Sequence, residues 1–163
     1  MGFDDLLAAN AEYAKTFHDH EFDGKARRGV LVLTCMDSRI EPLAMMGLGI
    51  GDAKILRTPG GFLTSESLVG CIVGIHKLGV NRIMVIQHTR CAMASSTDDA
   101  IRKIIASSAG RPADDLVLGA DTNQRGHLAS DIATLRDNEF IAGHAEVGGF
   151  IYDVDWGHLT QVL

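Results

Sequence analysis

The sequence is short of the features that mark several classes of protein. It holds only three cysteines, three prolines and one tryptophan, and aromatic residues make up 6% of it. The odd cysteine count, with no export signal in MGFDDLLAAN, argues against a disulfide framework and favours a reducing, cytoplasmic location. No apolar run reaches the ~18 residues of a membrane-spanning helix, so no membrane partner is expected.

Basic stretches are also missing. The longest is the pair Arg27-Arg28 and the formal net charge is -6, so no nucleic-acid partner is expected. What remains is a chain of 163 residues, 46% hydrophobic and 22% charged, which is typical of a globular protein that buries its own core. No repeat or linker divides it, and we therefore predict a single domain over residues 1–163.

Short runs typical of buried strands alternate with helical patterns along the chain. Strands are expected at 30–34, 53–57, 82–87 and 150–154, with 158–162 beside the last; helices are expected at 3–17, 41–47, 65–78, 100–109 and 124–136. The polar stretch 18–29 is expected to be a loop. This alternation predicts an α/β fold, with a mostly parallel central sheet of four to five strands flanked by helices.

Side chains that carry chemistry follow two of the predicted strands. Cys35, Asp37 and Arg39 follow the first, while His88 and Cys91 follow the third. The carboxyl ends of neighbouring parallel strands share one edge of a sheet, where ligands bind. Two sulfurs and one imidazole nitrogen suit Zn²⁺, with a fourth position open for water. The Arg39 guanidinium could hold Asp37 ionised, ready to accept a hydrogen bond from zinc-bound hydroxide or to become a fourth ligand.

Spacing alone leaves other interpretations open, because His-x-x-Cys is short and common. Cys35 could be an inert buried thiol, Asp37 the N-cap of a following helix, and Arg39 a surface or interface residue. A thiol redox protein using Cys35 and Cys91 is a separate possibility, although C-x-x-C is absent. Cys71, in the apolar run SLVGCIVGIHKL, is predicted to belong to the core.

The sequence assigns no catalytic role to two further side chains. Arg57 could hold a neighbouring loop or a dimer interface. His127, like the other histidines outside His-x-x-Cys, has no ligand spacing, and the sequence does not single out a proton shuttle among them.

Together these motifs resemble those of the β-class carbonic anhydrases, in particular short bacterial members. The family carries C-x-D-x-R after its first strand and H-x-x-C after its third, and both stand here in order, at 35–39 and 88–91. RTPGG at 57–61 resembles the family's R-N-A-G-G loop. Further similarity lies in the opening helix, in TDD at 97–99 and in the closing GFIYDVDWGHLTQV, so the resemblance covers nearly the whole chain.

The resemblance implies a specific chemistry. Cys35, His88 and Cys91 would hold one Zn²⁺ per chain, and Asp37 with Arg39 would form the catalytic dyad. The implied reaction is the reversible hydration of carbon dioxide to bicarbonate through a zinc-bound hydroxide. It also implies a homodimer or a dimer of dimers, with the N-terminal helix within residues 1–17 packed on a partner.

Three departures from the family's pattern bear on substrate and rate. Ala92 stands where the family has glycine, Thr58-Pro59 where it has Asn-Ala, and Arg90 places a cation inside H-x-x-C. Alanine would strain or narrow the site if that position needs a positive φ, and proline removes an N–H. Two alternatives therefore stay open. One is a carbonyl sulfide or carbon disulfide hydrolase on the same scaffold, and the other is a non-catalytic zinc-binding member with Asp37 on the metal.

Overall fold

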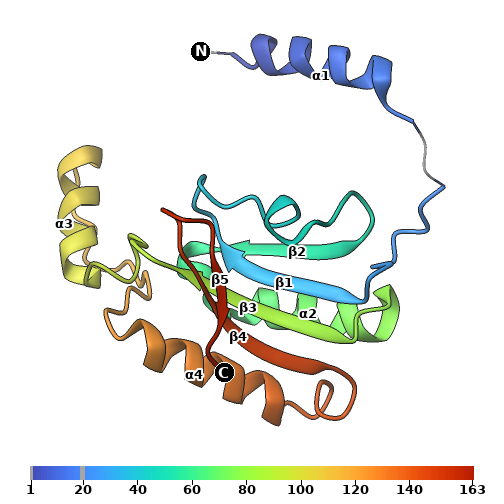
Figure 1. Ribbon diagram of the computed structural model, residues 1–163. Coiled ribbons are helices and arrows are strands. Elements are labelled where there is room, and N and C mark those ends of the chain that lie inside the picture. Colours follow the sequence, from blue (N-terminus) through green and yellow to red (C-terminus); the bar gives the residue numbers. More distant parts are fainter. Residues whose placement is uncertain (1, 19–20) are drawn as a thin grey trace.

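A five-stranded sheet forms the centre of the computed structural model, which describes residues 2–18 and 21–163 (Figure 1). Its strands are β1 (Val30–Cys35), β2 (Ala53–Thr58), β3 (Arg82–His88), β4 (Glu146–Tyr152) and β5 (Leu159–Gln161). Their order is β2-β1-β3-β4-β5. All neighbours are parallel except β5, which runs antiparallel to β4. The predicted α/β fold with a mostly parallel sheet is confirmed.

Helices connect and flank these strands. They are α1 (Asp4–Thr16), α2 (Ser65–Leu78), α3 (Asp98–Ala109) and α4 (Gln124–Asp137), with 3₁₀ turns η1 (Ala44–Met46) and η2 (Pro59–Gly61). Local signals set the ends of α2: Thr64 and Ser67 form a capping box, and Gly79 ends the helix with φ 76°. In the described part of the chain, every helix is too short or too polar to cross a bilayer.

Both faces of the sheet are covered, which explains the continuous apolar run of β1. On one face, α2 and α4 pack against β1 and β3 (Figure 1). That cluster contains Leu31, Leu33, Cys71, Ile83, Val85, Leu128, Ile132 and Leu135. On the other face, η1 and β5 contribute Met45, Met46 and Leu159 against Val30, Val32 and Ile86.

Three predicted element boundaries were wrong. The expected helix at 41–47 is only the 3₁₀ turn η1. Helix α3 begins at Asp98 rather than at residue 100, because the Thr97 hydroxyl caps it. Strand β4 begins at Glu146 rather than at residue 150, because glycines within it escaped a propensity-based assignment. A Cβ on Gly149 would lie 3.1 Å from Leu163 and 3.2 Å from Ile132, so close packing favours glycine there.

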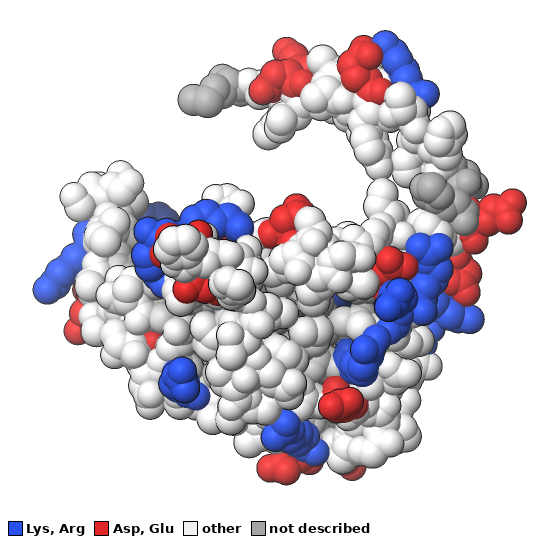
Figure 2. Space-filling model, viewed as in Figure 1, with Lys and Arg blue, Asp and Glu red and all other residues white. Residues whose placement is uncertain are grey.

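Helix α1 differs from the rest of the fold. It occurs almost where the sequence predicts it, yet none of its residues is buried, and Leu6 and Leu7 are exposed. Figures 1 and 2 show it standing away from the sheet and the other helices, with open space between. Met1 of the predicted domain and residues 19–20 of the predicted loop lie outside the described residues.

Candidate metal centre

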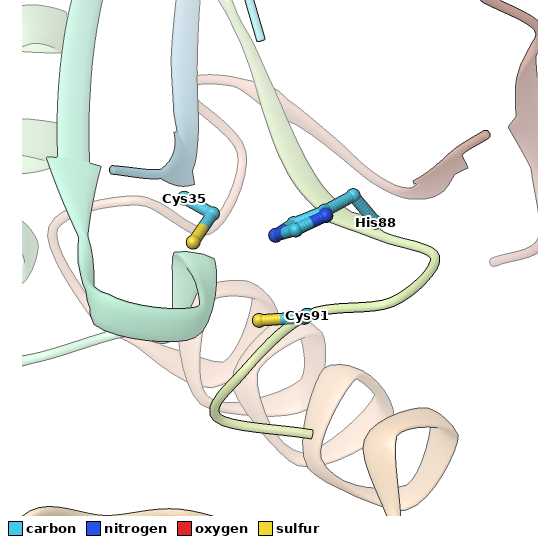
Figure 3. A group of neighbouring side chains, drawn as sticks. All are labelled: Cys35, His88 and Cys91. Carbon is cyan, nitrogen blue, oxygen red and sulfur yellow. The ribbon is translucent and has the colours of Figure 1, made fainter. Parts of the chain in front are cut away.

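Two cysteines and one histidine converge at the carboxyl edge of the sheet. Cys35 is the last residue of β1, His88 the last of the neighbouring strand β3, and Cys91 lies in the turn that follows. Their ligand atoms all lie within 4.8 Å of one another, and the two sulfurs and the imidazole point toward a common centre (Figure 3). The three side chains are 5%, 0% and 2% exposed. The parallel strand order thus brings together residues separated by more than fifty positions.

The hydrogen bonds of His88 leave one ring nitrogen free to bind a metal. Its Nδ1 donates to the Thr89 carbonyl oxygen at 2.9 Å, while its Nε2 is buried without a hydrogen-bond partner among the described residues. An unpaired buried polar atom is costly, about 1–3 kcal/mol, unless something satisfies it. A histidine that donates through one nitrogen and offers the other is the usual arrangement at a metal. The His88 carbonyl is held in turn by Nε2 of Gln124 at 2.9 Å.

The two sulfurs lie among hydrogen-bond donors. The Cys91 thiol and the His88 imidazole beside the Cys35 sulfur lower the pKa of Cys35 to about 4, and the neighbouring Cys35 sulfur raises the pKa of Cys91. The backbone N–H group of Asp37, beside Cys35, and those of Met93 and Ala94, beside Cys91, also favour the thiolate forms. The pair therefore gives up its first proton readily. A soft, thiophilic cation such as Zn²⁺ fits this donor set.

An ion pair borders the centre. Arg39 grips Asp37 with both prongs of its guanidinium, Nε to Oδ1 at 2.9 Å and Nη2 to Oδ2 at 2.7 Å. This contact holds the pKa of Asp37 well below its usual range. Asp37 Oδ2 lies 3.9 Å from His88 Nε2, so an ionised acceptor faces the sulfur–imidazole cluster. The alternative role of Asp37 as a helix N-cap is wrong, since the next helical turn, η1, is preceded by Leu43.

Arg57 fastens the loop that carries this ion pair. Its Nε donates to the Cys35 carbonyl at 3.0 Å, and its Nη2 donates to the carbonyls of Asp37 at 2.7 Å and Ile40 at 3.2 Å. Of the two sequence-based interpretations, a hold on a neighbouring loop is the one this geometry supports. Arg57 acts on the backbone and does not face the centre.

A cavity of about 630 Å³ opens beside the cluster. Its walls combine the polar ends of Asp37 and Arg39 with apolar surface from Met36, Ala92 and Met93. The complete lining is Cys35, Met36, Asp37, Ser38, Arg39, Pro59, Gly60, Cys91, Ala92 and Met93. A small apolar molecule could therefore reach the point where the three candidate ligands meet.

The TPGG loop forms one wall and is seated tightly on the strand ends. A Cβ on Gly61, which has φ 70°, would lie 2.9 Å from the Ile86 carbonyl oxygen and 3.0 Å from the Cys35 nitrogen. Only glycine permits both this φ and this approach. The Thr58 hydroxyl closes the loop by donating to the Phe62 carbonyl at 2.7 Å.

Among the departures from the family's pattern, Arg90 was expected to place its positive charge beside the metal centre. Its guanidinium is instead paired with Asp155. Its backbone has φ 54°, uncommon for a residue with a side chain, and its carbonyl accepts a hydrogen bond from Arg39 Nη2 at 3.2 Å. Arg90 thus helps to hold the Asp37–Arg39 pair through its backbone.

Comparison with known proteins identifies the class. The family model described as carbonic anhydrase matches residues 30–159, most of the chain and every residue of the site. The chain belongs to the carbonic anhydrase family.

Its relatives narrow this to the β class. Beta-carbonic anhydrase 1 of Mycobacterium tuberculosis is 28% identical over 160 residues, covering 98% of this chain and 96% of that protein. The crystal structure of a carbonic anhydrase from Streptococcus mutans superposes with a TM-score of 0.90 at 29% identity, over 100% of this chain and 99% of that one. A carbon disulfide hydrolase of Acidithiobacillus thiooxidans is 28% identical over 152 residues, covering 81% of this chain and 76% of that protein.

Proposed function

We propose that this protein catalyses the reversible hydration of carbon dioxide to bicarbonate in the cytoplasm, with one Zn²⁺ per chain held by Cys35, His88 and Cys91. The observation that carries the proposal is the unpaired, buried Nε2 of His88, facing two cysteine sulfurs beside an ionised carboxylate. Zinc in such a site lowers the pKa of a bound water to about 7 and so supplies a nucleophile at neutral pH.

The chain's own residues divide the remaining work. Asp37, kept ionised by Arg39, accepts a hydrogen bond at Oδ2 and so orients the attacking group. The apolar side chains of Met36, Ala92 and Met93 give linear, uncharged carbon dioxide a place to bind near it. Arg39 lies at the wall of the same cavity, where its positive charge also suits an anionic product.

Hydrolysis of carbon disulfide or carbonyl sulfide is the second candidate. These molecules are linear and uncharged like carbon dioxide but larger and softer. Two observations favour keeping it: the similarity to the Acidithiobacillus carbon disulfide hydrolase, and the polarisable thioethers of Met36 and Met93 on the cavity wall. In a non-catalytic member, Asp37 would serve as fourth ligand. A redox pair is a weaker candidate, although Cys35 and Cys91 are free thiols. Nε2 of the neighbouring His88 has no hydrogen-bond partner among the described residues, and this favours a metal.

We also propose that residues 1–17 pack on a second copy of the chain, giving a homodimer or a dimer of dimers. The apolar side chains of Phe3, Leu6 and Leu7 are exposed in one chain, and a partner would bury them. Light scattering should give a dimer mass or a multiple of it. The doubly substituted Leu6→Asp, Leu7→Asp variant should shift toward monomer, and a monomeric wild type would contradict the proposal.

Stopped-flow carbon dioxide hydration tests the activity directly. Protein of measured zinc content is assayed at several pH values beside a Cys35→Ala variant. We expect turnover in the wild type and none above background in the variant. Zinc-loaded wild type without turnover at any pH would overturn the proposal, and release of hydrogen sulfide from carbon disulfide would then establish the second candidate.

A further inference from the structure

A cluster outside the candidate metal centre joins helix α4 to the chain that leaves the TPGG loop. The His127 ring, in the first turns of α4, stacks on the Phe62 ring with centroids 3.9 Å apart and an interplanar angle of 19°. Its Nδ1 lies 3.3 Å from Asp121 Oδ2, and its Nε2 lies 3.7 Å from Asp131 Oδ1. The other oxygen of Asp131 accepts the Leu63 N–H at 3.0 Å.

This cluster reaches the cavity wall through one aromatic ring. Pro59 and Gly60 line the cavity. A Cβ on Gly60 would lie only 2.6 Å from the Phe62 ring, so the ring and the Gly60 backbone are packed against each other. Because Phe62 also stacks on His127, a displacement of the imidazole would be passed to the wall through a single rigid side chain.

Asp131 makes the link costly to break. Its carboxyl is buried, and burial raises its pKa. Burying a polar group without partners costs free energy. The Asp131 carboxyl has two partners, the Leu63 N–H and the His127 imidazole. An imidazole suits the position, since its flat face covers Phe62 while a nitrogen at each side faces a carboxylate.

We propose that His127, held by Asp131 and Asp121, is a positioning residue that fixes the Pro59–Gly60 wall of the cavity through Phe62 and Leu63. It is neither one of the three clustered candidate ligands nor one of the residues that line the cavity. The consequence for catalysis rests on the proposed hydration of carbon dioxide; the consequence for the loop does not.

A rival role for His127 is proton transfer, because hydration of each carbon dioxide releases one proton that must leave the site. The two roles differ in kinetics. A misplaced wall impairs substrate binding and attack and so lowers kcat/KM, whereas a lost relay lowers kcat and is rescued by an added buffer such as imidazole.

The test uses His127→Gln, which keeps a hydrogen-bond donor but loses the ring, and His127→Phe, which keeps a stacking ring but loses both nitrogens. Asp131→Asn removes the charge but keeps an acceptor for Leu63. His144→Phe is the matched control, because His144 is an exposed histidine whose ring neighbour is His76. Circular dichroism and zinc content establish that each variant is folded and loaded.

Amide hydrogen exchange over residues 60–63 is the first readout, in metal-free and zinc-loaded protein. We expect faster exchange in His127→Gln and Asp131→Asn, with His144→Phe like the wild type. The second readout is hydration kinetics, where we expect kcat/KM to fall ~10-fold in His127→Gln with kcat nearly unchanged. Unaltered exchange would overturn the positioning role, as would a fall in kcat alone that imidazole restores. If the wild type does not hydrate carbon dioxide, the exchange result still decides the positioning role while the proposed function fails.

Discussion

Two buried cysteines in this chain have opposite chemistry. Cys71 lies on α2 among apolar side chains, fully buried, and burial raises the pKa of its thiol to about 12. Cys35 is almost as well covered, yet the Cys91 thiol and His88 lower its pKa to about 4. Burial by itself makes a thiol inert, and only the donors gathered at the edge of the sheet make one a ligand.

The same contrast separates the two regions as wholes. The interface of α2 with the sheet is apolar and its contacts serve stability. At the carboxyl edge, two sulfurs and the His88 imidazole converge, with the Asp37–Arg39 ion pair beside them, and this polar arrangement suits a metal or a reacting group. We therefore expect substitutions at the edge to affect chemistry far more than stability, and substitutions in α2 to do the reverse.

The largest effect is expected from Cys35→Ala. We expect this variant to lose its bound zinc and its hydration activity to fall at least ~100-fold. Only two ligand side chains remain to hold the metal, and an uncharged alanine replaces the thiolate beside His88. Metal analysis by mass spectrometry measures the first and stopped-flow kinetics the second. Cys71→Ala should keep one zinc per chain. If Cys35→Ala also retained one zinc per chain, Cys35 would be no more a metal ligand than Cys71 is.

Arg39→Met should give the next largest effect. Without the guanidinium, the pKa of the Asp37 carboxyl rises from its lowered value toward its usual range, so the carboxylate takes up its proton at a higher pH than in the wild type. In the wild type, the lowered pKa of Asp37 stabilises the folded protein at pH values above the unfolded pKa of this carboxyl. That stabilisation is lost only as the pH falls through the lower folded pKa. We also expect kcat/KM to fall by ~10²-fold at neutral pH. The zinc-bound water, with a pKa of about 7, would dominate the acid side of the hydration profile, so the Asp37 pKa is followed directly by carboxyl NMR titration of metal-free protein. An Asp37 carboxyl that titrates in Arg39→Met as it does in the wild type would show that Arg39 does not set its ionisation.

Arg57→Met tests the support of the edge rather than its chemistry. Three carbonyls lose their donor, but the side chain is exposed, so we expect a loss of about 1–2 kcal/mol in urea unfolding. Zinc should stay bound, and kcat/KM should fall less than in Arg39→Met. An effect on turnover as large as that of Arg39→Met would mean that Arg57 belongs to the reacting machinery.

The smallest effect is expected from Cys71→Ala, which removes one buried sulfur atom from the α2 core. We expect a loss of about 1 kcal/mol in the free energy of unfolding and no change in zinc content or turnover. Denaturant titration beside the hydration assay measures both. A marked change in turnover would show that the core below the edge is not merely structural.

The sequence predicted the edge better than it predicted the support of that edge. The buried run of β1 and the strand that ends at His88 were visible in composition, and parallel order alone brings Cys35, His88 and Cys91 to one place. Whether Asp37 capped a helix or met Arg39 depended on loop curvature, which periodicity does not encode. The contact between Phe62 and His127 joins residues far apart in the chain, and no rule based on residue spacing predicts it.

Helix α1 is an element whose existence the sequence predicts but whose contacts it does not. Its existence follows from local pattern and acidic residues in its first turn, and both are visible in the sequence. What its apolar side chains contact is not a local property, and within one chain they remain exposed.

X-ray absorption at the zinc edge of the purified protein tests the central claim most directly, because it counts the ligand atoms of the metal without reference to turnover. The account predicts two sulfurs at about 2.3 Å and lighter ligands at about 2.0–2.1 Å in the wild type and in Cys71→Ala, whereas Cys35→Ala should lose its zinc, with at most one sulfur, that of Cys91, around any metal that remains. Zinc bound without sulfur, or a sulfur signal indifferent to Cys35, would contradict it.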